Sequence, residues 1–458
     1  MIDIIIVFSY LILLLFIGIF QRSKQDGFKN FSRATGSTIQ KSKLILVATI
    51  FASTIGGGTT FGIAEKTFAD NISYSYGLFL VIPVDLAIAY YIIPRIIKHY
   101  GAESVGNIMD VYYGSVGRYI AGLSSILVSV GLVAAQISVS GRIFEYILQI
   151  NYIYGVILSY GIVVVYTTIG GFRSVLFANQ LQFFAILFAI PVISIFGIYE
   201  LGISNFIESI PSEKVSLFNN EDLLTATISA ALGFAVMNMF PTFIQRALIN
   251  KNNASTSKAI YIKSIIYAFF LVFITINGLL AFSIFPNAKA SLALPQLIDH
   301  IIPVGIQGFV VVGLLAAVMS TADSDLNITS ITLVKDFLKP IFKISQQNRM
   351  LFFARIINVL IGSLAIIIAL CFDRVADLVI FIAGFWGPVI LTPLIFALFN
   401  IVISKKAFAI SCLAGAIGFI GWETIFSTSI NFKGVFVGTV INLVCFMLFY
   451  LCGSRNNK

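Results

Sequence analysis

The segment LILVATIFASTIGGGTTFGIAEKTF (Leu44–Phe68) combines membrane-spanning length with a feature that an ordinary membrane helix avoids. About 20 mostly apolar residues are enough to cross a bilayer core, and this segment meets that length. Three consecutive glycines, Gly56 to Gly58, lie in its middle with hydroxyl side chains on both sides. Glycines favour unwinding, and hydroxyls can pair with the backbone groups that unwinding frees. The segment therefore predicts a broken membrane helix; close helix packing through small residues is the alternative.

The composition of the whole chain indicates a membrane protein. Of the 458 residues, 59% are hydrophobic and 11% are charged, whereas soluble globular chains carry about 25% charged residues. Such a chain cannot cover itself with polar surface, so lipid must be its solvent. The four cysteines lie in apolar stretches without metal-ligand spacing, which favours buried small side chains over a zinc site or a disulfide framework.

About thirteen segments have the length and apolarity of transmembrane helices. We therefore predict an all-α polytopic membrane protein, with residues 1–458 as a single membrane domain. The first segment lacks the basic n-region and the cleavage motif of a signal peptide. The expected spans are 2–20, 44–64, 77–98, 118–147, 153–171, 179–200, 222–245, 262–284, 303–332, 350–371, 376–401, 405–425 and 433–452.

Basic residues predict the orientation of these spans. With the N-terminus outside, most of the 29 Lys and Arg residues fall in or nearest to cytoplasmic connections, Arg246 and Lys263 among them. This distribution follows the positive-inside rule and places the C-terminus in the cytoplasm, which fits a multi-pass protein of the cell membrane. The net charge of +9 is then explained by topology and does not indicate nucleic-acid binding. The exceptions, which fall outside, are Lys66, Lys214, Lys289, Arg374 and Lys433, and Arg142 lies within a span.

A second interrupted helix is expected five spans after the first. It reads ISAALGFAVMNMFPTFIQRALINK (Ile228–Lys251). Pro241 removes a helix hydrogen bond, and Asn238 can pair with the exposed carbonyls. A proline kink alone is weak evidence, but an offset of five spans is what two inverted five-helix repeats predict.

The ninth span is unusually rich in polar side chains. Polar groups this dense at membrane depth are costly unless they face a cavity, an ion or one another. Ala317, Ser320, Thr321 and Ser324 lie on one helical face, and hard cations such as sodium prefer oxygen ligands. A solvated cytoplasmic helix end is the alternative for Asp325 to Ser330. The polar residues are Ser320, Thr321, Asp323, Ser324, Asp325, Asn327, Thr329 and Ser330.

The stretch ALPQLIDHIIPVGIQGFVVVGLLAAVMSTADSDLN (Ala293–Asn327) resembles the signature of the sodium:solute symporter family. That family includes sodium–proline, sodium–glucose, sodium–pantothenate and sodium–sialic acid symporters. The pieces FASTIGGGTTFG, GLVAAQISVSGRIFEYILQI, YTTIGGFRSV and FPTFIQR are similar to its other recurring motifs and occur in the same order. The resemblance implies sodium-coupled symport of a small polar solute by alternating access.

The resemblance also implies a leucine-transporter-like core. Its inverted repeats would be residues 44–200 and 222–401, with peripheral helices at 1–20 and 405–452. The coupling ion, Na⁺, would bind between the first and eighth core helices. Carried over residue by residue, its ligands would be the carbonyls of Ala52, Ile55 and Ala317 and the hydroxyls of Ser320 and Thr321.

Two departures from the family pattern narrow the expected function. Several members carry an Asp that helps to hold a second sodium, and Asn179 occupies the matching position here. Because a neutral amide supplies no charge, we expect one sodium ion per solute. Leu78 and Val81 stand near the positions where glucose-type members carry polar sugar-binding residues. An amino acid such as proline, or a similar metabolite, is therefore favoured over a sugar.

The solute is expected to bind between the two broken helices. Gln136 could equally form an interhelical hydrogen bond. Asp85 is an intramembrane carboxylate that could bind a cationic group or a proton, or make a polar packing contact. The candidates for lining the cavity are Gly57, Gly58, Thr59, Gln136, Met237, Asn238, Phe240, Pro241 and Trp386.

Other functions remain open at this point. A proton-coupled transporter of the same fold would titrate Asp85 or Asp323. A transporter-like solute sensor would need an output domain, for which Gln21–Lys43 offers no room, and a channel would need a continuous pore with a repeated filter. No catalytic triad or phosphate loop occurs, so we expect neither an enzyme nor an organic cofactor. The expected partners are the solute and the bilayer, without nucleic acid or an obligatory oligomer.

Overall fold

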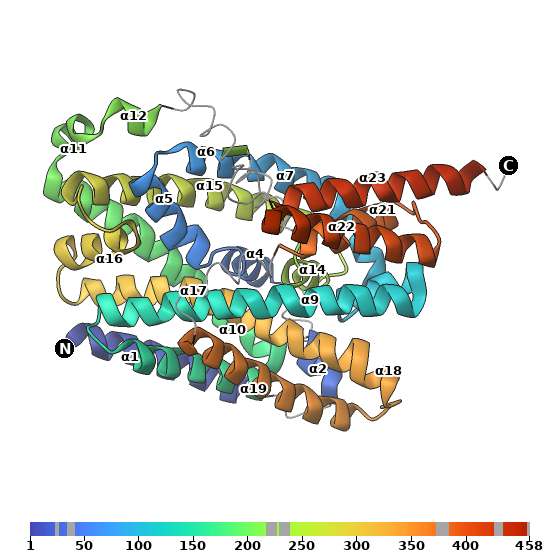
Figure 1. The fold of residues 1–458 in the computed structure, drawn as a ribbon. Coiled ribbons are helices and arrows are strands. Elements are labelled where there is room, and N and C mark those ends of the chain that lie inside the picture. Colours follow the sequence, from blue (N-terminus) through green and yellow to red (C-terminus); the bar gives the residue numbers. More distant parts are fainter. Residues whose placement is uncertain are drawn as a thin grey trace.

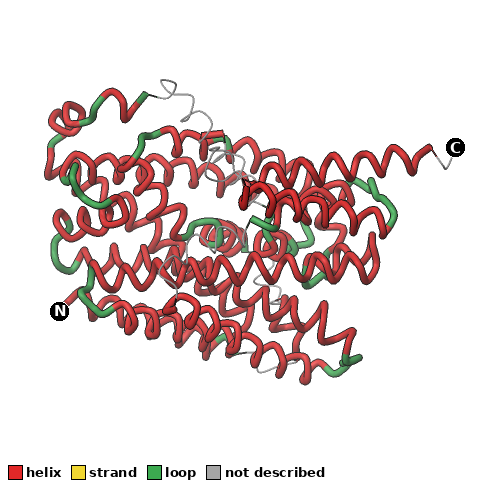
Figure 2. Tube along the Cα trace, viewed as in Figure 1, coloured by secondary structure: helices red, strands yellow, loops and turns green. Residues whose placement is uncertain are grey.

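The computed structural model describes residues 1–22, 27–33, 42–216, 227–228, 239–371, 384–425 and 434–455. Helices and short turns make up these residues, and they contain no strand (Figure 2). The long helices run side by side, with the first residues of α1 (Ile2–Phe20) and the last of α23 (Gly434–Arg455) at opposite ends of the bundle (Figure 1). The predicted all-α membrane fold is thus confirmed.

Nine helical segments of the described residues are long and apolar enough to cross a bilayer. Between them lie shorter elements that connect or interrupt the spans. The nine are α1, α6 to η3 (Ser73–His99), α9 (Val105–Tyr146), α10 (Tyr152–Leu201), α15 (Asn253–Ile284), α17 to α18 (Ile306–Ile341), α19 (Gln347–Cys371), α22 (Lys405–Ile425) and α23. The shorter elements include α2 (Gly27–Arg33), α4 (Lys43–Ala52), η1 (Gly58–Gly62), α5 (Ile63–Ala69), α11 (Ile203–Ser209), α12 (Ser212–Val215), α14 (Pro241–Ala247), α16 (Ala290–Ile301), η5 (Gly387–Leu391) and α21 (Thr392–Leu398).

Within Ser73–His99 the segment runs through α6 (Ser73–Phe79), α7 (Val81–Ala87), η2 (Ile88–Ile92), α8 (Ile93–Ile96) and η3 (Ile97–His99). Within Ile306–Ile341 it runs through α17 (Ile306–Thr332), η4 (Leu333–Leu338) and α18 (Lys339–Ile341). Several of the expected spans fall partly outside the described residues, so the count of thirteen stays a prediction.

The helix α10 is two spans joined by a reversal at Gly171. The Ser174 hydroxyl donates a hydrogen bond to the Tyr166 carbonyl at 3.1 Å, although eight residues of one straight helix would separate them by about 12 Å. Gly171 has φ +60°, a conformation that side chains with a Cβ disfavour. The predicted spans 153–171 and 179–200 are therefore separate, and no loop lies between them. The helix α9 turns in the same way at Gly114, where φ is +62°.

The helix α17 forms the axis of the core. It packs against α1, α9 and α10, and every residue from Val310 to Thr332 is buried. The alternative that Asp325 to Ser330 form a solvated helix end is therefore wrong. Neighbouring helices enclose this polar stretch. The hydroxyls of Thr329 and Ser330 donate to carbonyls of the same helix, and Asp325 accepts a hydrogen bond from Ser129 of α9.

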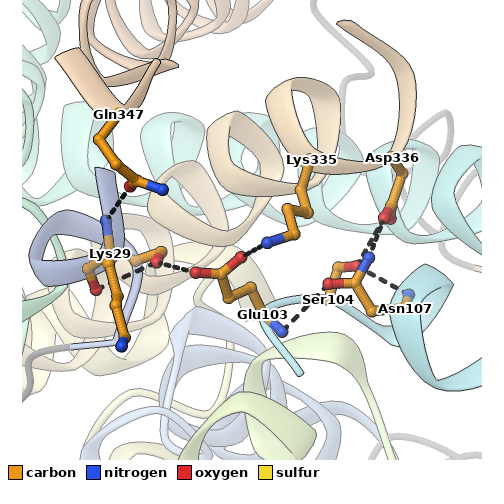
Figure 3. Close-up of polar contacts among 8 residues, drawn as sticks. Lys29, Glu103, Ser104, Asn107, Lys335, Asp336 and Gln347 are labelled. Carbon is orange, nitrogen blue, oxygen red and sulfur yellow. Dashed lines mark hydrogen bonds and ion pairs between the residues drawn. The ribbon is translucent and has the colours of Figure 1, made fainter. Parts of the chain in front are cut away.

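A polar cluster fastens the end of this axis to the segments around it. Lys335, in η4, forms an ion pair with Glu103, which also accepts a hydrogen bond from Ser32 of α2 at 2.9 Å. The neighbouring Asp336 accepts one from Ser104 at 2.8 Å. Figure 3 shows Lys335 and Asp336 side by side, reaching toward the segment that precedes α9. The cluster thus joins three chain segments at the end of the bundle where α2 and α18 lie (Figure 1).

Asp85 and Lys263 form an ion pair that is buried between α7 and α15. The Lys263 ammonium lies 2.8 Å from the Asp85 carboxylate, and the two side chains are 1% and 0% exposed. The Ser264 hydroxyl donates to the same carboxylate oxygen at 2.7 Å. Lys263, which the positive-inside count assigns to the nearest cytoplasmic connection, lies within α15 and is buried inside the protein. For Asp85 the geometry favours the packing contact.

Removing one partner of this pair should destabilise the protein. Asp85→Asn leaves the buried Lys263 without a counter-charge, which typically costs about 3–5 kcal/mol. We expect a clear fall in the thermal unfolding midpoint of the purified protein in detergent. Asp70→Asn is the matched control, since Asp70 pairs with Lys66 across 3.5 Å at an exposed position, where ion pairs contribute little. Equal shifts for the two variants would contradict the assignment.

Candidate cation site

The first broken helix unwinds between Ala52 and Gly57. The helix α4 ends at Ala52, and η1 begins at Gly58. In a continuous helix the Gly56 N–H would bond to the Ala52 carbonyl. Here it donates to the Thr59 hydroxyl at 2.8 Å. The Thr59 N–H, which would bond to the carbonyl of Ile55, donates to that of Gly56 instead. Both the Ala52 and the Ile55 carbonyls are thereby released from the helix.

The unwound residues overlap the glycine triplet only at Gly56. Gly57 already has helical backbone angles, φ −56° and ψ −37°, and Gly58 is the first residue of η1. The break therefore ends at Gly56, and Gly57 and Gly58 begin the next helix. The new helix starts here because Gln136 caps it: its side-chain oxygen accepts a hydrogen bond from the Gly57 N–H at 2.7 Å. An interhelical hydrogen bond is thus the role that the structure gives Gln136.

Two hydroxyls of α17 meet the released carbonyls. The Ser320 hydroxyl oxygen lies 2.8 Å from the Ala52 carbonyl and 3.0 Å from the Ala317 carbonyl. That of Thr321 lies 3.0 Å from the Ile55 carbonyl and 3.4 Å from the Ala317 carbonyl. The structure therefore brings together all five oxygens that the resemblance implies, from segments more than 260 residues apart.

This oxygen cluster suits a small hard cation of single charge. It consists of three carbonyls and two hydroxyls and carries no formal charge of its own. A cation close to Ca²⁺ in size, such as Na⁺, needs oxygens at about 2.3–2.6 Å, which small movements of these groups can provide. The C-terminal end of α4 also points its partial negative charge toward the cluster. Among the described residues, His, Cys, Asp and Glu form no group of three that could hold a metal ion.

The candidate solute-binding residues are placed unevenly. Gly58 is exposed, whereas Gly57, Thr59 and Gln136 are buried. Phe240 and Trp386 contact each other edge to face, with ring centroids 6.3 Å apart. The helix α14 begins at Pro241 rather than running through it, as expected for a second break. Met237 and Asn238 lie outside the described residues.

Asn179 lies beside the first broken helix. Its amide nitrogen donates to the hydroxyl of Thr49, on α4, at 2.9 Å. Thr49 precedes Ala52 by one helical turn, so Asn179 ties α10 to the helix that supplies the carbonyls. Its amide oxygen is buried without a hydrogen-bond partner. The position thus holds a neutral group that already contacts α4.

Arg246 is a buried residue that the sequence led us to misplace. The positive-inside count assigns it to a cytoplasmic connection, but its side chain is 0% exposed. It lies on α14, which packs against α4, α9 and α17, and it donates hydrogen bonds to the Thr242 carbonyl and to the hydroxyl of Ser324. The sequence signal that could have indicated its burial is its place in the motif FPTFIQR, shortly after the expected break at Pro241.

A broken helix whose free carbonyls face hydroxyls of another helix is the arrangement found in ion-coupled secondary transporters. The chain belongs to the sodium:solute symporter family, whose model matches residues 41–418.

Two curated relatives illustrate the range of this family. The sodium/pantothenate symporter of Haemophilus influenzae is 25% identical over 57% of this chain, and the match spans only 56% of that relative. The high-affinity proline transporter PutP of Bacillus subtilis is 25% identical over 69% of this chain and 71% of that protein.

A solved structure shows the same fold over nearly the whole length. It is that of a Na⁺-coupled sialic acid symporter in a substrate-bound, outward-open state. The TM-score is 0.86 at 17% sequence identity, and the match covers 99% of this chain and 98% of that one. The implied leucine-transporter-like fold is thus confirmed, while the identity is too low to carry over a solute.

Removing the two hydroxyls should weaken sodium binding. The double variant Ser320→Ala/Thr321→Ala deletes two neutral oxygens without adding bulk. We expect the apparent sodium affinity to fall at least about tenfold, or about 1.4 kcal/mol, in ²²Na⁺ binding to the purified protein. Ser330→Ala is the control, because that hydroxyl donates only to the Asn327 carbonyl of its own helix. Unchanged affinity in the double variant would rule out these ligands.

A methyl group at Gly57 should disturb the capped break. A Cβ there would lie 2.8 Å from the Val139 side chain on α9, and such overpacking costs about 1–3 kcal/mol. Gly57→Ala should therefore lower solute uptake, and adding Val139→Ala should restore it. Gly161→Ala is the control, since a Cβ at Gly161 would meet nothing within 4 Å. Full uptake by Gly57→Ala would show that this close contact is unimportant.

Proposed function

We propose that the protein is a secondary active transporter that moves a small polar organic solute across the cell membrane together with Na⁺, by alternating access. The observation that carries this proposal is the meeting of the freed Ala52 and Ile55 carbonyls with the hydroxyls of Ser320 and Thr321. Membership of the sodium:solute symporter family supports it independently.

The site explains how an ion could control the conformation. Na⁺ bound there would link α4, which precedes the break, to α17, the axis of the core. Its binding energy would favour the state in which these two helices are close. A solute that binds better to the same state would then raise the affinity of the protein for Na⁺. By reciprocity, Na⁺ would raise the affinity for the solute by the same factor. Such mutual dependence is what couples the two movements.

For the solute we propose an amino acid such as proline, or a similar small polar metabolite. Leu78 and Val81 are 0% and 2% exposed, so this part of the core is apolar and closed. The exposed Gly58 marks the place where a solute could approach the broken helix. We further propose an outside N-terminus and a cytoplasmic C-terminus, supported by the positions of α1 and α23 at opposite ends of the bundle (Figure 1).

Proton coupling is the second candidate, because Asp323 and Asp325 are buried in α17, close to the proposed sodium ligands. The decisive experiment is uptake of a panel of radiolabelled amino acids and vitamins into proteoliposomes. One set of vesicles would carry an inward sodium gradient, one an inward proton gradient and one neither. Accumulation of a solute with the sodium gradient alone would support the proposal. Accumulation with the proton gradient in sodium-free buffer would contradict it.

The neutral Asn179 predicts the stoichiometry of transport. One sodium ion should enter with each solute molecule, because the position that would charge a second site carries an amide engaged with Thr49. The Hill coefficient for sodium should therefore be near one, and dual-isotope flux should count one Na⁺ per solute. Two ions per solute would contradict this expectation.

A further inference from the structure

The core holds three buried charges that the proposed sodium ligands do not include. Arg246 of α14 and Asp323 of α17 are both 0% exposed, and Asp325 is 1% exposed. An unpaired charge in the membrane interior is costly, so groups like these are held together or near an ion. These charges lie close to the proposed sodium ligands. Asp323 follows Ser320 by three residues on α17, and Arg246 lies on α14, which packs against α17.

Ser324 is the bridge between the cation and one of the carboxylates. Its hydroxyl accepts a hydrogen bond from the Arg246 guanidinium and lies 2.9 Å from an oxygen of Asp323. The same hydroxyl lies 2.7 Å from the carbonyl of Ser320, one turn away. The second oxygen of Asp323 accepts a hydrogen bond from Tyr166. The guanidinium is therefore joined through one hydroxyl both to a carboxylate and to a residue of the sodium site.

Other contacts hold the guanidinium in place. It donates to the carbonyl of Thr242, on its own helix, at 3.0 Å, and it lies 5.7 Å from the centre of the Phe172 ring. Aromatic faces attract cations at such distances. Arg246 interacts electrostatically with both Asp323 and Asp325, and the latter also accepts a hydrogen bond from Ser129 at 2.9 Å.

The charges of these three residues explain why one sodium ion would balance the charge of the core. With both carboxylates ionised, Asp323, Asp325 and the Arg246 guanidinium together carry one net negative charge. Without Arg246 two negative charges would remain uncompensated, and the low dielectric of the interior would favour a second cation beside Asp323. One Na⁺ at the neutral oxygen site balances the charge that remains when Arg246 is present.

We propose that Arg246 is a tethered counter-ion that neutralises Asp323 through Ser324, so that one sodium ion suffices and the Asp323 carboxylate is unavailable to a second. Arg246 is thus a positioning residue for coupling, since it acts on the sodium site through Ser324 and Ser320. This inference rests on the proposed function and adds to it the origin of the single-ion stoichiometry.

A charge-compensated pair of variants tests the proposal. Saturation binding of ²²Na⁺ to the purified protein would be measured for wild type, Arg246→Met, Asp323→Asn and the double variant. Arg246→Met should bind two sodium ions instead of one, because Asp323 loses its counter-ion. Asp323→Asn should bind sodium at least about tenfold more weakly, because Arg246 and Asp325 then neutralise each other and the negative charge that one Na⁺ would balance is gone. The double variant should return to one ion, with an affinity within about threefold of wild type.

A merely structural role would give a different pattern. Both single variants would then weaken binding, and the double variant would be worse than either, which would overturn the proposal. Unchanged binding in both single variants would overturn it as well. Arg355→Met is the control, because that partly buried arginine donates to the Ile169 carbonyl and its electrostatic partner is Arg22 instead of Asp323 or Asp325; it should leave the ion count and the affinity unchanged.

Two further comparisons keep the test decisive. If Arg246→Met does not fold, Arg246→Lys keeps the charge and should bind one ion with nearly wild-type affinity, while Asp323→Asn still has to weaken binding. A folded double variant beside an unfolded Arg246→Met would itself support mutual compensation. Absence of sodium binding in the wild type would refute the proposed function. Binding of one ion by the wild type and by all variants at equal affinity would refute only the role of Arg246.

Discussion

A backbone polar group cannot remain unpaired inside a bilayer, and much of the core follows from that constraint. Where α4 ends at Ala52, the next N–H groups donate to the side chains of Thr59 and of Gln136, on α9, and leave two carbonyls free. The only groups that the fold brings to these carbonyls, within the described residues, are the hydroxyls of Ser320 and Thr321. A small cation can satisfy the same oxygens. The break therefore creates both the ligands of an ion and the reason to bind one.

The helix α17 connects this site to the rest of the protein. It is buried over its central length, and most of its polar side chains find a partner inside the protein, whereas the Asn327 amide and the Thr332 hydroxyl are buried without one. Ser320 faces the broken helix, whereas Ser324, one turn further on, faces Arg246 and Asp323. The proposed sodium site and the charged cluster therefore lie on the same helix, so a movement of that helix changes both. Ser320 and Ser324 are one helical turn apart, so an interaction between the two sites has to extend over that distance only.

Buried charges in this protein are compensated within the core. Lys263 and Asp85 neutralise each other between α7 and α15, and Arg246 is joined to Asp323 through a hydroxyl. Arg246 directly follows the predicted span 222–245 and Lys263 lies at the start of the span 262–284, so the positive-inside count assigns both to the nearest connection. In both cases the surrounding helices extend further than the apolar run and enclose the charge. A counter-charge on another helix is what makes that burial tolerable.

The sequence by itself determined the class of protein and the approximate places of the breaks, because composition, a glycine triplet and a proline act locally. Through the family signature it also led to the five oxygens of the candidate site. Only the tertiary structure decided that the unwinding precedes Gly57, that Gln136 caps the new helix and that Asp85 pairs with Lys263. The physical reason is distance along the chain. Asp85 and Lys263 are 178 residues apart, and the choice of partner for a buried polar group depends on which helices pack together.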